Sequence, residues 1–278
     1  MSFDERIVPA RKDIAADFLK NKHKSQKFVS GIKKEVIFPK TNLYSINDTK
    51  APLATELLLG EEFVVYENKA GWSWGQSLRD SYVGYVRSES LSTYNKNKYH
   101  IVSNIFAPVY EEPKTRSRVM MKLCMNSKIS ISKSRKNFLL SNVGWILDEH
   151  IKKDDAFEKD FVEIATKFIN TPYLWGGKSY SGIDCSGLVQ LSLQRFGILS
   201  PRDSDQQERN LGKNIGKVAE NLERGDLVFW KGHVAIVVDS NSIIHANSFH
   251  KKVTLESTQE AIERLKAKSI FISSIKRI

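Results

Sequence analysis

The chain has 278 residues, of which 41% are hydrophobic and 27% charged, and its formal net charge is +11. This composition is ordinary for a globular protein and excludes both wholesale disorder and a fibrous protein. The length exceeds what one small core needs and suits two or three compact units.

No apolar run approaches the ~20 residues that a membrane-spanning helix requires, so we expect no membrane span. Residues 1–20 mix both charge signs and lack the apolar stretch of a secretory signal, and the simplest location is therefore the cytoplasm. There the two cysteines, Cys124 and Cys185, are expected to be free thiols. Cysteine and histidine do not occur at zinc-site spacing, and we expect no metal and no other cofactor.

The positive charge is uneven along the chain. Residues 1–152 hold 25 basic and 16 acidic residues, whereas residues 153–278 hold 18 and 16. A basic N-terminal half can bind nucleic acid, an anionic envelope polymer or an acidic small substrate. We favour a solvated Lys-rich surface and expect no nucleic-acid partner, because no compact basic motif is present. The sequence leaves the oligomeric state open, and a monomer is favoured.

The N-terminal half divides into a lead-in and two similar segments. In residues 1–35, Ile14 and Phe18 follow Pro9 at loosely helical spacing, which predicts a helical lead-in. In residues 36–95 and 99–152, short apolar runs alternate with turns, which predicts small all-β barrels. Gly84-Tyr-Val and Gly144-Trp-Ile lie late in each segment and indicate an internal duplication. This pattern resembles two tandem bacterial SH3-like barrels, with a polar linker at residues 94–98.

Residues 153–278 are predicted to form an α+β domain. Four apolar residues at helical spacing predict a first helix that Pro172 ends: Phe157, Phe161, Ile164 and Phe168. A second helix should begin near Cys185 and stop at Gly197. Apolar runs at 226–230, 233–239 and 242–247 then predict antiparallel strands.

Cys185 is the candidate nucleophile. The glycine-flanked turn Gly182-Ile-Asp-Cys-Ser-Gly187 places it at a helix start, where partial positive charge and free N–H groups favour a thiolate. The same N–H groups can hold the oxyanion of an acyl-transfer intermediate. The alternative for any lone cysteine is a buried structural thiol, which is our interpretation of Cys124 between Leu123 and Met125.

His233 is the candidate base. It opens an apolar strand, and a turn near Ser240 would pair residue 233 with residue 247, one diagonal step from His245 on the same face. Two adjacent imidazoles suit a base whose second nitrogen is oriented by a third group. The alternative is two core histidines bonded to backbone. We interpret the other four histidines as surface residues: His23, His100, His150 and His250.

Six short motifs in order carry a family resemblance: Tyr173-Leu-Trp-Gly-Gly177, Asp184-Cys-Ser-Gly-Leu188, Arg202-Asp-Ser-Asp-Gln-Gln207, Gly225-Asp-Leu-Val-Phe-Trp230, Gly232-His-Val-Ala-Ile236 and Ile244-His-Ala246. Together they resemble the NlpC family of papain-like cysteine peptidases over residues 155–275. With the SH3-like pair upstream, the chain resembles the cytoplasmic subgroup that trims cell-wall muropeptides.

The resemblance implies roles for named residues. Cys185 matches the nucleophile, His233 the general base and His245 the third, orienting residue. The matches around the substrate are Tyr173 beside the thiol, Trp175 in the pocket wall, and Asp184, Ser186 and Ser204 at the D-glutamyl group. In the first barrel, Glu61 and Tyr82 are candidates to hold the free amine of L-Ala. The alternatives for these two are a solvated edge carboxylate and a barrel-core ring.

The implied function is hydrolysis of the bond between γ-D-glutamate and a diamino acid, diaminopimelate or lysine. The substrates would be muropeptides with a free N-terminal L-Ala, as in murein peptide recycling. Two alternatives remain: a peptidoglycan-binding adaptor with an inactive catalytic domain, and an amidase or acyltransferase on another substrate.

Overall fold

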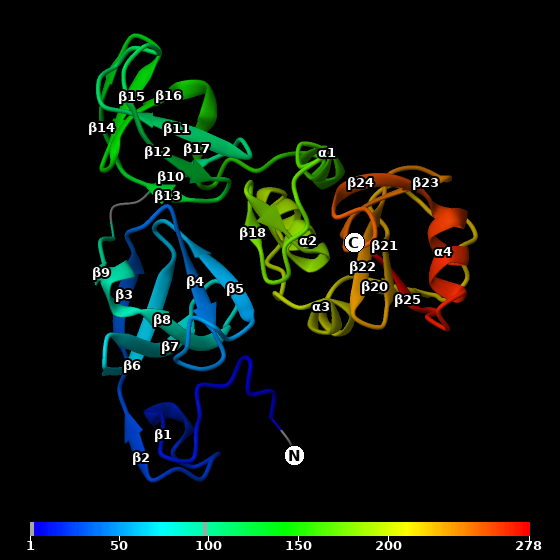
Figure 1. Cartoon of the computed structure of the whole chain (residues 1–278), viewed down its shortest axis with the longest axis horizontal. Coiled ribbons are helices and arrows are strands. Elements are labelled where there is room, and N and C mark those ends of the chain that lie inside the picture. Colours follow the sequence, from blue (N-terminus) through cyan, green and yellow to red (C-terminus); the bar gives the residue numbers. More distant parts are fainter. Residues whose placement is uncertain (1–2, 97–98) are drawn as a thin grey trace. The chain divides into compact units, whose positions relative to one another are not determined.

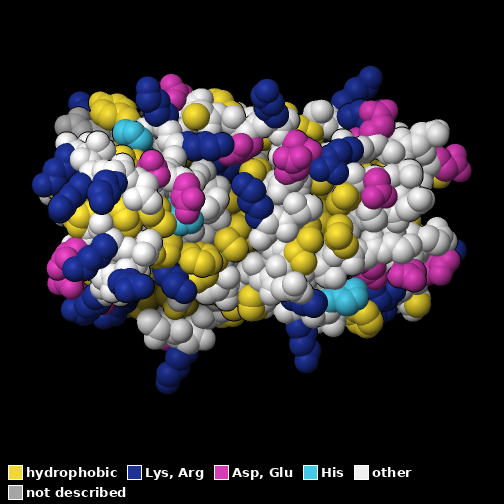
Figure 2. Space-filling view, turned by 90° about the horizontal axis from the view of Figure 1, so that it is seen from above, with side chains coloured by type: hydrophobic (Ala, Val, Ile, Leu, Met, Phe, Trp, Pro, Cys, Tyr) yellow, Lys and Arg dark blue, Asp and Glu magenta, His cyan; other side chains and the backbone are white. Residues whose placement is uncertain are grey.

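A computed structural model describes residues 3–96 and 99–278, so part of the linker predicted at 94–98 lies outside the described residues. The chain divides into two compact units, residues 1–156 and 157–278. Among the described residues, no helix combines the length and the hydrophobicity that crossing a bilayer requires. Figure 2 shows one face of the molecule, on which Lys and Arg side chains are interspersed with acidic and hydrophobic ones.

The lead-in is not helical, and the prediction of a helix there was wrong. Its elements are β1 (Ile14–Ala16), a 3-10 turn (Asp17–Leu19) and β2 (Lys27–Val29), which pairs in parallel with β1. All three residues of β1 are buried, and Ile14 packs with Trp74 and Val83 of the neighbouring sheet, whereas Phe18 is 58% exposed. Packing against that sheet therefore outweighs a weak local helical pattern.

The first sheet of the N-terminal unit has seven antiparallel strands in the order β5-β4-β8-β7-β6-β3-β9 (Figure 1). Its strands are β3 (Ile32–Val36), β4 (Lys40–Tyr44), β5 (Leu53–Leu58), β6 (Glu62–Lys69), β7 (Trp72–Ser77), β8 (Val83–Arg87) and β9 (Leu91–Thr93). Alternate residues of these strands point inward and form a core that includes Val36, Leu43 and Phe63.

Residues 100–153 form two further sheets, in the orders β12-β11-β16-β15-β14 and β13-β10-β17. Their strands are β10 (His100–Val102), β11 (Phe106–Tyr110), β12 (Val119–Cys124), β13 (Lys128–Ile129), β14 (Ile131–Arg135), β15 (Phe138–Ser141), β16 (Gly144–Leu147) and β17 (Ile151–Lys153).

These two sheets, taken in succession, repeat the strand order of the first sheet, with the counterpart of β6 divided into β13 and β14. Gly84 in β8 and Gly144 in β16 occupy equivalent strands, and a 3-10 turn and a short strand follow each of them. The internal duplication is thus visible in the topology. Within the described residues, however, the strands pair as open sheets, so the predicted closed barrels are not observed.

The C-terminal unit combines four helices with a six-stranded antiparallel sheet in the order β20-β25-β21-β22-β23-β24 (Figure 1). The helices are α1 (Phe161–Thr166), α2 (Cys185–Arg195), α3 (Ser204–Asn210) and α4 (Thr258–Lys266). The strands of the sheet are β20 (Lys213–Gly216), β21 (Leu227–Trp230), β22 (His233–Val237), β23 (Ser242–Asn247), β24 (Lys252–Ser257) and β25 (Ile272–Arg277). A small hairpin, β18 (Lys178–Ser179) and β19 (Gly182–Ile183), precedes α2.

Local signals set the ends of the helices. Helix α1 is shorter than predicted because Asp160 caps it and leaves Phe157 outside. Helix α2 begins at Cys185, where Asp184 accepts a hydrogen bond from the N–H of Gly187, and it ends before Gly197 (φ +94°), as predicted. Because α2 packs against β22 and β23, its N-terminus is fixed beside the sheet that carries the candidate histidines.

Candidate active site

Cys185 is the first residue of α2, and 8% of its surface is exposed. Burial, followed by the charge of Asp184, raises the pKa of its thiol to about 12, although the N–H groups of Val234 and Ser186 hydrogen-bond to the sulfur and oppose that shift. The raised pKa favours the neutral thiol over the thiolate that we predicted at the helix start.

His233 is the first residue of β22, and its ring packs on Trp230 with centroids 5.8 Å apart. The N–H of Val234, the next residue, hydrogen-bonds to the sulfur of Cys185, so the start of β22 meets the N-terminus of α2. Burial, and then the charges of His245 and Arg264, lower the pKa of His233 to about 3. The imidazole is thus neutral and able to accept a proton.

His233 and His245 are hydrogen-bonded to each other. The distance from Nε2 of His233 to Nδ1 of His245 is 2.9 Å. Ile236 pairs with Ile244 and Val237 with Ile243, and the same offset carried along β22 sets residue 233 opposite residue 247. This is the predicted register, with His245 one diagonal step away.

Glu256 and Arg264 extend this chain of contacts, and the sequence did not reveal them. Nε2 of His245 lies 2.8 Å from Oε2 of Glu256. Arg264 of α4 donates to both oxygens of the same carboxylate, at 3.0 and 2.7 Å. Burial raises the pKa of Glu256, but the hydrogen bonds from His245 and Arg264 prevail and hold it at about 2. Glu256 is therefore an anion. Glu256 could have been found from the sequence only by predicting β24 and its register with β23 correctly.

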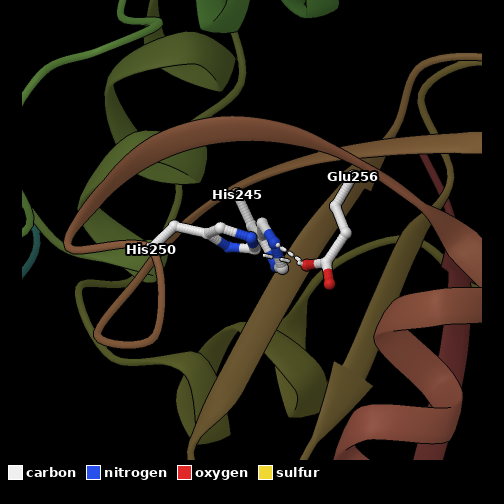
Figure 3. A group of neighbouring side chains, drawn as sticks. All are labelled: His245, His250 and Glu256. Atoms are coloured by element: carbon white, nitrogen blue, oxygen red, sulfur yellow. Dashed lines mark hydrogen bonds and ion pairs between the residues drawn. The ribbon is translucent and has the colours of Figure 1, made fainter.

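His250 lies beside this group rather than at a remote surface position. Figure 3 shows His245, His250 and Glu256 turned toward one another, with Nδ1 of His250 3.9 Å from Oε2 of Glu256. Two imidazoles and a carboxylate are donors that suit a divalent cation. Arg264, however, already bonds both carboxylate oxygens and places a positive charge there, which opposes a cation. We therefore assign this group to the hydrogen-bonded chain of the histidines.

Asp184 and Ser186, which were predicted to contact the D-glutamyl group of the substrate, form hydrogen bonds with Arg202. The carboxylate of Asp184 accepts hydrogen bonds from the N–H groups of Gly187 (2.7 Å) and Gly176 (2.8 Å) and from both terminal nitrogens of Arg202 (2.9 and 2.7 Å). Arg202 also donates to the hydroxyl of Ser186 at 2.9 Å. Arg202 stands in one of the six motifs, but its pairing with Asp184 was not predicted.

The other predicted substrate residues differ in burial and in position. Burial, followed by the charges of Cys185 and Asp184, raises the pKa of Tyr173 to about 12, so its hydroxyl keeps its proton at neutral pH. Trp175 is 66% exposed. Ser204 begins α3, a helix that packs against α2.

Glu61 and Tyr82 lie in the N-terminal unit. Glu61 is 2% exposed and forms an ion pair with Nε of Arg79 at 3.0 Å, so the alternative of a solvated edge carboxylate was wrong. Tyr82 is 6% exposed and belongs to the core that includes Leu57 and Phe63, which agrees with the alternative interpretation of Tyr82 as a core ring.

Comparison with known proteins shows which families the two halves of the chain match. Residues 170–269 match the NlpC/P60 family, and residues 43–91 match the bacterial dipeptidyl-peptidase Sh3 domain. The chain thus contains an NlpC/P60 cysteine peptidase domain preceded by a bacterial SH3 domain, and it belongs to the hydrolases.

Two curated relatives and one solved structure are similar to most of the chain. Dipeptidyl-peptidase 6 of Lysinibacillus sphaericus is 28% identical over 252 residues, which cover 81% of this chain and 91% of the relative. Gamma-D-glutamyl-L-lysine dipeptidyl-peptidase of Bacillus cereus is 27% identical over 236 residues, 73% of this chain and 70% of that one. The crystal structure of an NlpC/P60 family protein from Bacillus cereus has a TM-score of 0.73 at 22% identity, covering 88% of this chain and 99% of that chain. The last similarity supports the papain-like fold.

Proposed function

We propose that this protein hydrolyses the bond between γ-D-glutamate and a diamino acid, diaminopimelate or lysine, in muropeptides with a free N-terminal L-Ala. The observation that carries the proposal is the direct hydrogen bond between His233 and His245, beside a strand start whose next N–H binds the sulfur of Cys185. The names of the relatives, a dipeptidyl-peptidase and a gamma-D-glutamyl-L-lysine dipeptidyl-peptidase, support this class of bond.

In the proposed reaction, the sulfur of Cys185 attacks the γ-carbonyl carbon while His233 takes the thiol proton. The thiol and the imidazole are both neutral beforehand, so charge separates only during the attack. The C–N bond of the tetrahedral intermediate then breaks, a thioester remains, and the amine leaves with the proton from His233. Water, deprotonated by the same imidazole, attacks the thioester and releases the γ-carboxylic acid and the thiol.

The developing oxyanion needs donors close to the sulfur. The N-terminus of α2 supplies backbone N–H groups there. Tyr173 is a second donor in the proposal, because the raised pKa of its hydroxyl keeps the proton on the oxygen. The two kinds of donor would stabilise negative charge on the carbonyl oxygen of the intermediate.

The substrate contacts are also proposals. We assign the D-glutamyl group to the region of Asp184, Ser186 and Ser204, and the exposed ring of Trp175 to the wall of the pocket. Glu61 and Tyr82 remain predictions from the resemblance as ligands of the L-Ala amine. Arg79 already neutralises Glu61, which makes Glu61 a weaker ligand for an amine than a carboxylate without such a partner.

The remaining features extend the same proposal. Residues 99–152 are proposed to be a second SH3-like domain, supported by their repeat of the first sheet's strand order. The protein is proposed to act as a monomer in the cytoplasm during peptide recycling. That placement follows from the proposed substrate, whose free L-Ala amine requires that the peptide has been released from the glycan strand.

The test is mass spectrometry of the products from a mixed muropeptide pool. We expect L-Ala-γ-D-Glu and a peptide with a new diamino acid N-terminus, formed from free peptides and not from peptides whose L-Ala is acetylated or still joined to glycan. A Cys185→Ser variant should release neither product. Unchanged peptides with the wild-type chain would favour the adaptor, and products cleaved at another bond would favour the amidase or acyltransferase.

A further inference from the structure

We propose that Glu256, held by Arg264, is a positioning residue that sets the tautomers of both histidines and leaves Nδ1 of His233 free to accept the thiol proton. The inference rests on the thiol chemistry of the proposed function but not on the identity of the peptide substrate. It adds a carboxylate and a guanidinium to the three residues that the sequence indicated.

The sheet brings these groups to one face. Ile243 of β23 packs in the core that includes Ala261 of α4, so residues of β23 with the same parity, His245 among them, point toward α4. Glu256 of β24 pairs with Ile243 in the register and lies on that same face, one diagonal step from His245. The strand pairing alone thus delivers the carboxylate to the imidazole.

Hydrogen-bond chemistry then fixes each proton. An ionised carboxylate only accepts, so the 2.8 Å contact to Glu256 requires a proton on Nε2 of His245. A neutral imidazole carries one proton, which leaves Nδ1 of His245 as an acceptor. The 2.9 Å contact to His233 therefore requires a proton on Nε2 of His233. The remaining nitrogen of His233, Nδ1, has a free lone pair and is the base.

Arg264 keeps the carboxylate ionised and aimed. Its Nε donates to Oε1 at 3.0 Å and its Nη2 to Oε2 at 2.7 Å, a bidentate arrangement that fixes the plane of the carboxylate. The guanidinium carbon also lies 4.7 Å from the centre of the Phe249 ring, which restricts the arginine. The side chains of Glu256 and Arg264 are 7% and 17% exposed, so water competes little for either.

The decisive variant is the double substitution Glu256→Met with Arg264→Met, made in the full chain. Replacing both members of a buried ion pair with apolar residues of similar size is close to neutral for folding, whereas a single substitution leaves one charge unpaired. The matched control is Asp226→Met with Arg277→Met. That pair is also bidentate, at 2.9 Å for both contacts, and Asp226 precedes β21 at the end away from His233.

Two measurements need no peptide substrate, so their failure is distinct from a failure of the proposed function. The first is the ¹⁵N NMR shift of each ring nitrogen of His233 and His245, which identifies the protonated one. The second is the rate at which iodoacetamide alkylates Cys185 at pH 7. We expect the wild-type chain and the control pair to have both histidines protonated on Nε2.

In the Glu256/Arg264 double variant, the loss of its acceptor should move the proton of His245 to Nδ1. His233 then accepts on Nε2 and carries its proton on Nδ1, so the base is lost and alkylation slows about 100-fold. A wild-type spectrum with His245 protonated on Nδ1 overturns the proposal, even if the double variant does not fold. Unchanged tautomers in a folded double variant overturn it as well, as does an alkylation rate within threefold of the control.

Discussion

Arg202 and Asp184 form a bidentate ion pair directly before the nucleophile, and Asp184 is the residue that caps α2. The side chain of Arg202 is 1% exposed, and its Nη2 also reaches the carbonyl oxygen of Gly177 at 3.2 Å. The pair thus fixes the helix start and the loop that precedes it, and it makes Arg202 a structural support for the position of Cys185.

Replacing Arg202 should therefore destabilise this region strongly. We expect Arg202→Met to lower the opening free energy of the α2 backbone amides by about 3–5 kcal/mol, because the buried carboxylate of Asp184 loses its counter-charge. Native-state hydrogen exchange of the full chain measures this. The control is Arg224→Met, since Arg224 is 45% exposed in its ion pair with Asp160 and its loss should cost less than about 1 kcal/mol. Equal effects of the two substitutions would contradict the assignment.

Acid should destabilise the C-terminal unit through His233. The folded chain holds the pKa of this imidazole at about 3, below its ordinary value of 6.5, because burial disfavours the charged ring. Between these two values the unfolded chain binds a proton that the folded chain does not, so stability falls as the pH drops below 6.5. Urea unfolding at pH 7, 6 and 5 measures the trend. A His233→Gln variant should show a shallower loss, and an identical loss in both proteins would show that other groups cause it.

Alkali should also destabilise the folded chain, in this case through the thiol of Cys185, so that stability falls as the pH rises. Burial raises the pKa of Cys185 from 9.0 to about 12, so above pH 9 the unfolded chain loses a proton that the folded chain keeps. The unfolding free energy of the wild type, minus that of Cys185→Ser, should fall by about 1.4 kcal/mol per pH unit above pH 9. Parallel urea titrations at pH 8, 9 and 10 test this. A flat difference would mean that the thiol is ionised at its ordinary pKa in the folded chain.

Trp175 should affect substrate binding without affecting stability. Because its side chain is 66% exposed, Trp175→Ala should change the unfolding free energy by less than about 0.5 kcal/mol. Loss of a substrate-facing ring should raise KM about tenfold for the tripeptide while kcat changes little. Leu199→Ala is the matched control, since Leu199 is 76% exposed and has no assigned role. The same KM for Trp175→Ala and the wild type would remove Trp175 from the pocket wall.

The features that the sequence predicted well are those set by neighbouring residues. The start of α2 follows from Asp184 and its end from Gly197, both local signals. The contact between the two histidines follows from a short turn and the period of two in strands, so it could be placed from 233–247 alone. Helices α1 and α2 and strands β21, β22 and β23 were predicted for the same reason, whereas α3, α4, β20, β24 and β25 were not predicted.

The features that were missed depend on distant packing. Strand β1 pairs in parallel with β2 across an intervening turn, and such short strands have no periodic signature. The thiol pKa depends on how deeply α2 is buried against β22, which no local pattern reports. Arg264 reaches Glu256 only because α4 folds back over the sheet.

The base and its supports all come from one continuous stretch, β22 through α4, whereas the sulfur comes from a separate helix. Residues 233–264 contain both imidazoles, the carboxylate and the guanidinium, so the side-chain hydrogen bonds that join these four groups all lie within this stretch. A substitution within this stretch can therefore change the base without replacing any residue of the helix that presents the sulfur. The two parts of the site meet where α2 packs against β22 and β23, and the backbone of Val234 is one of the contacts there.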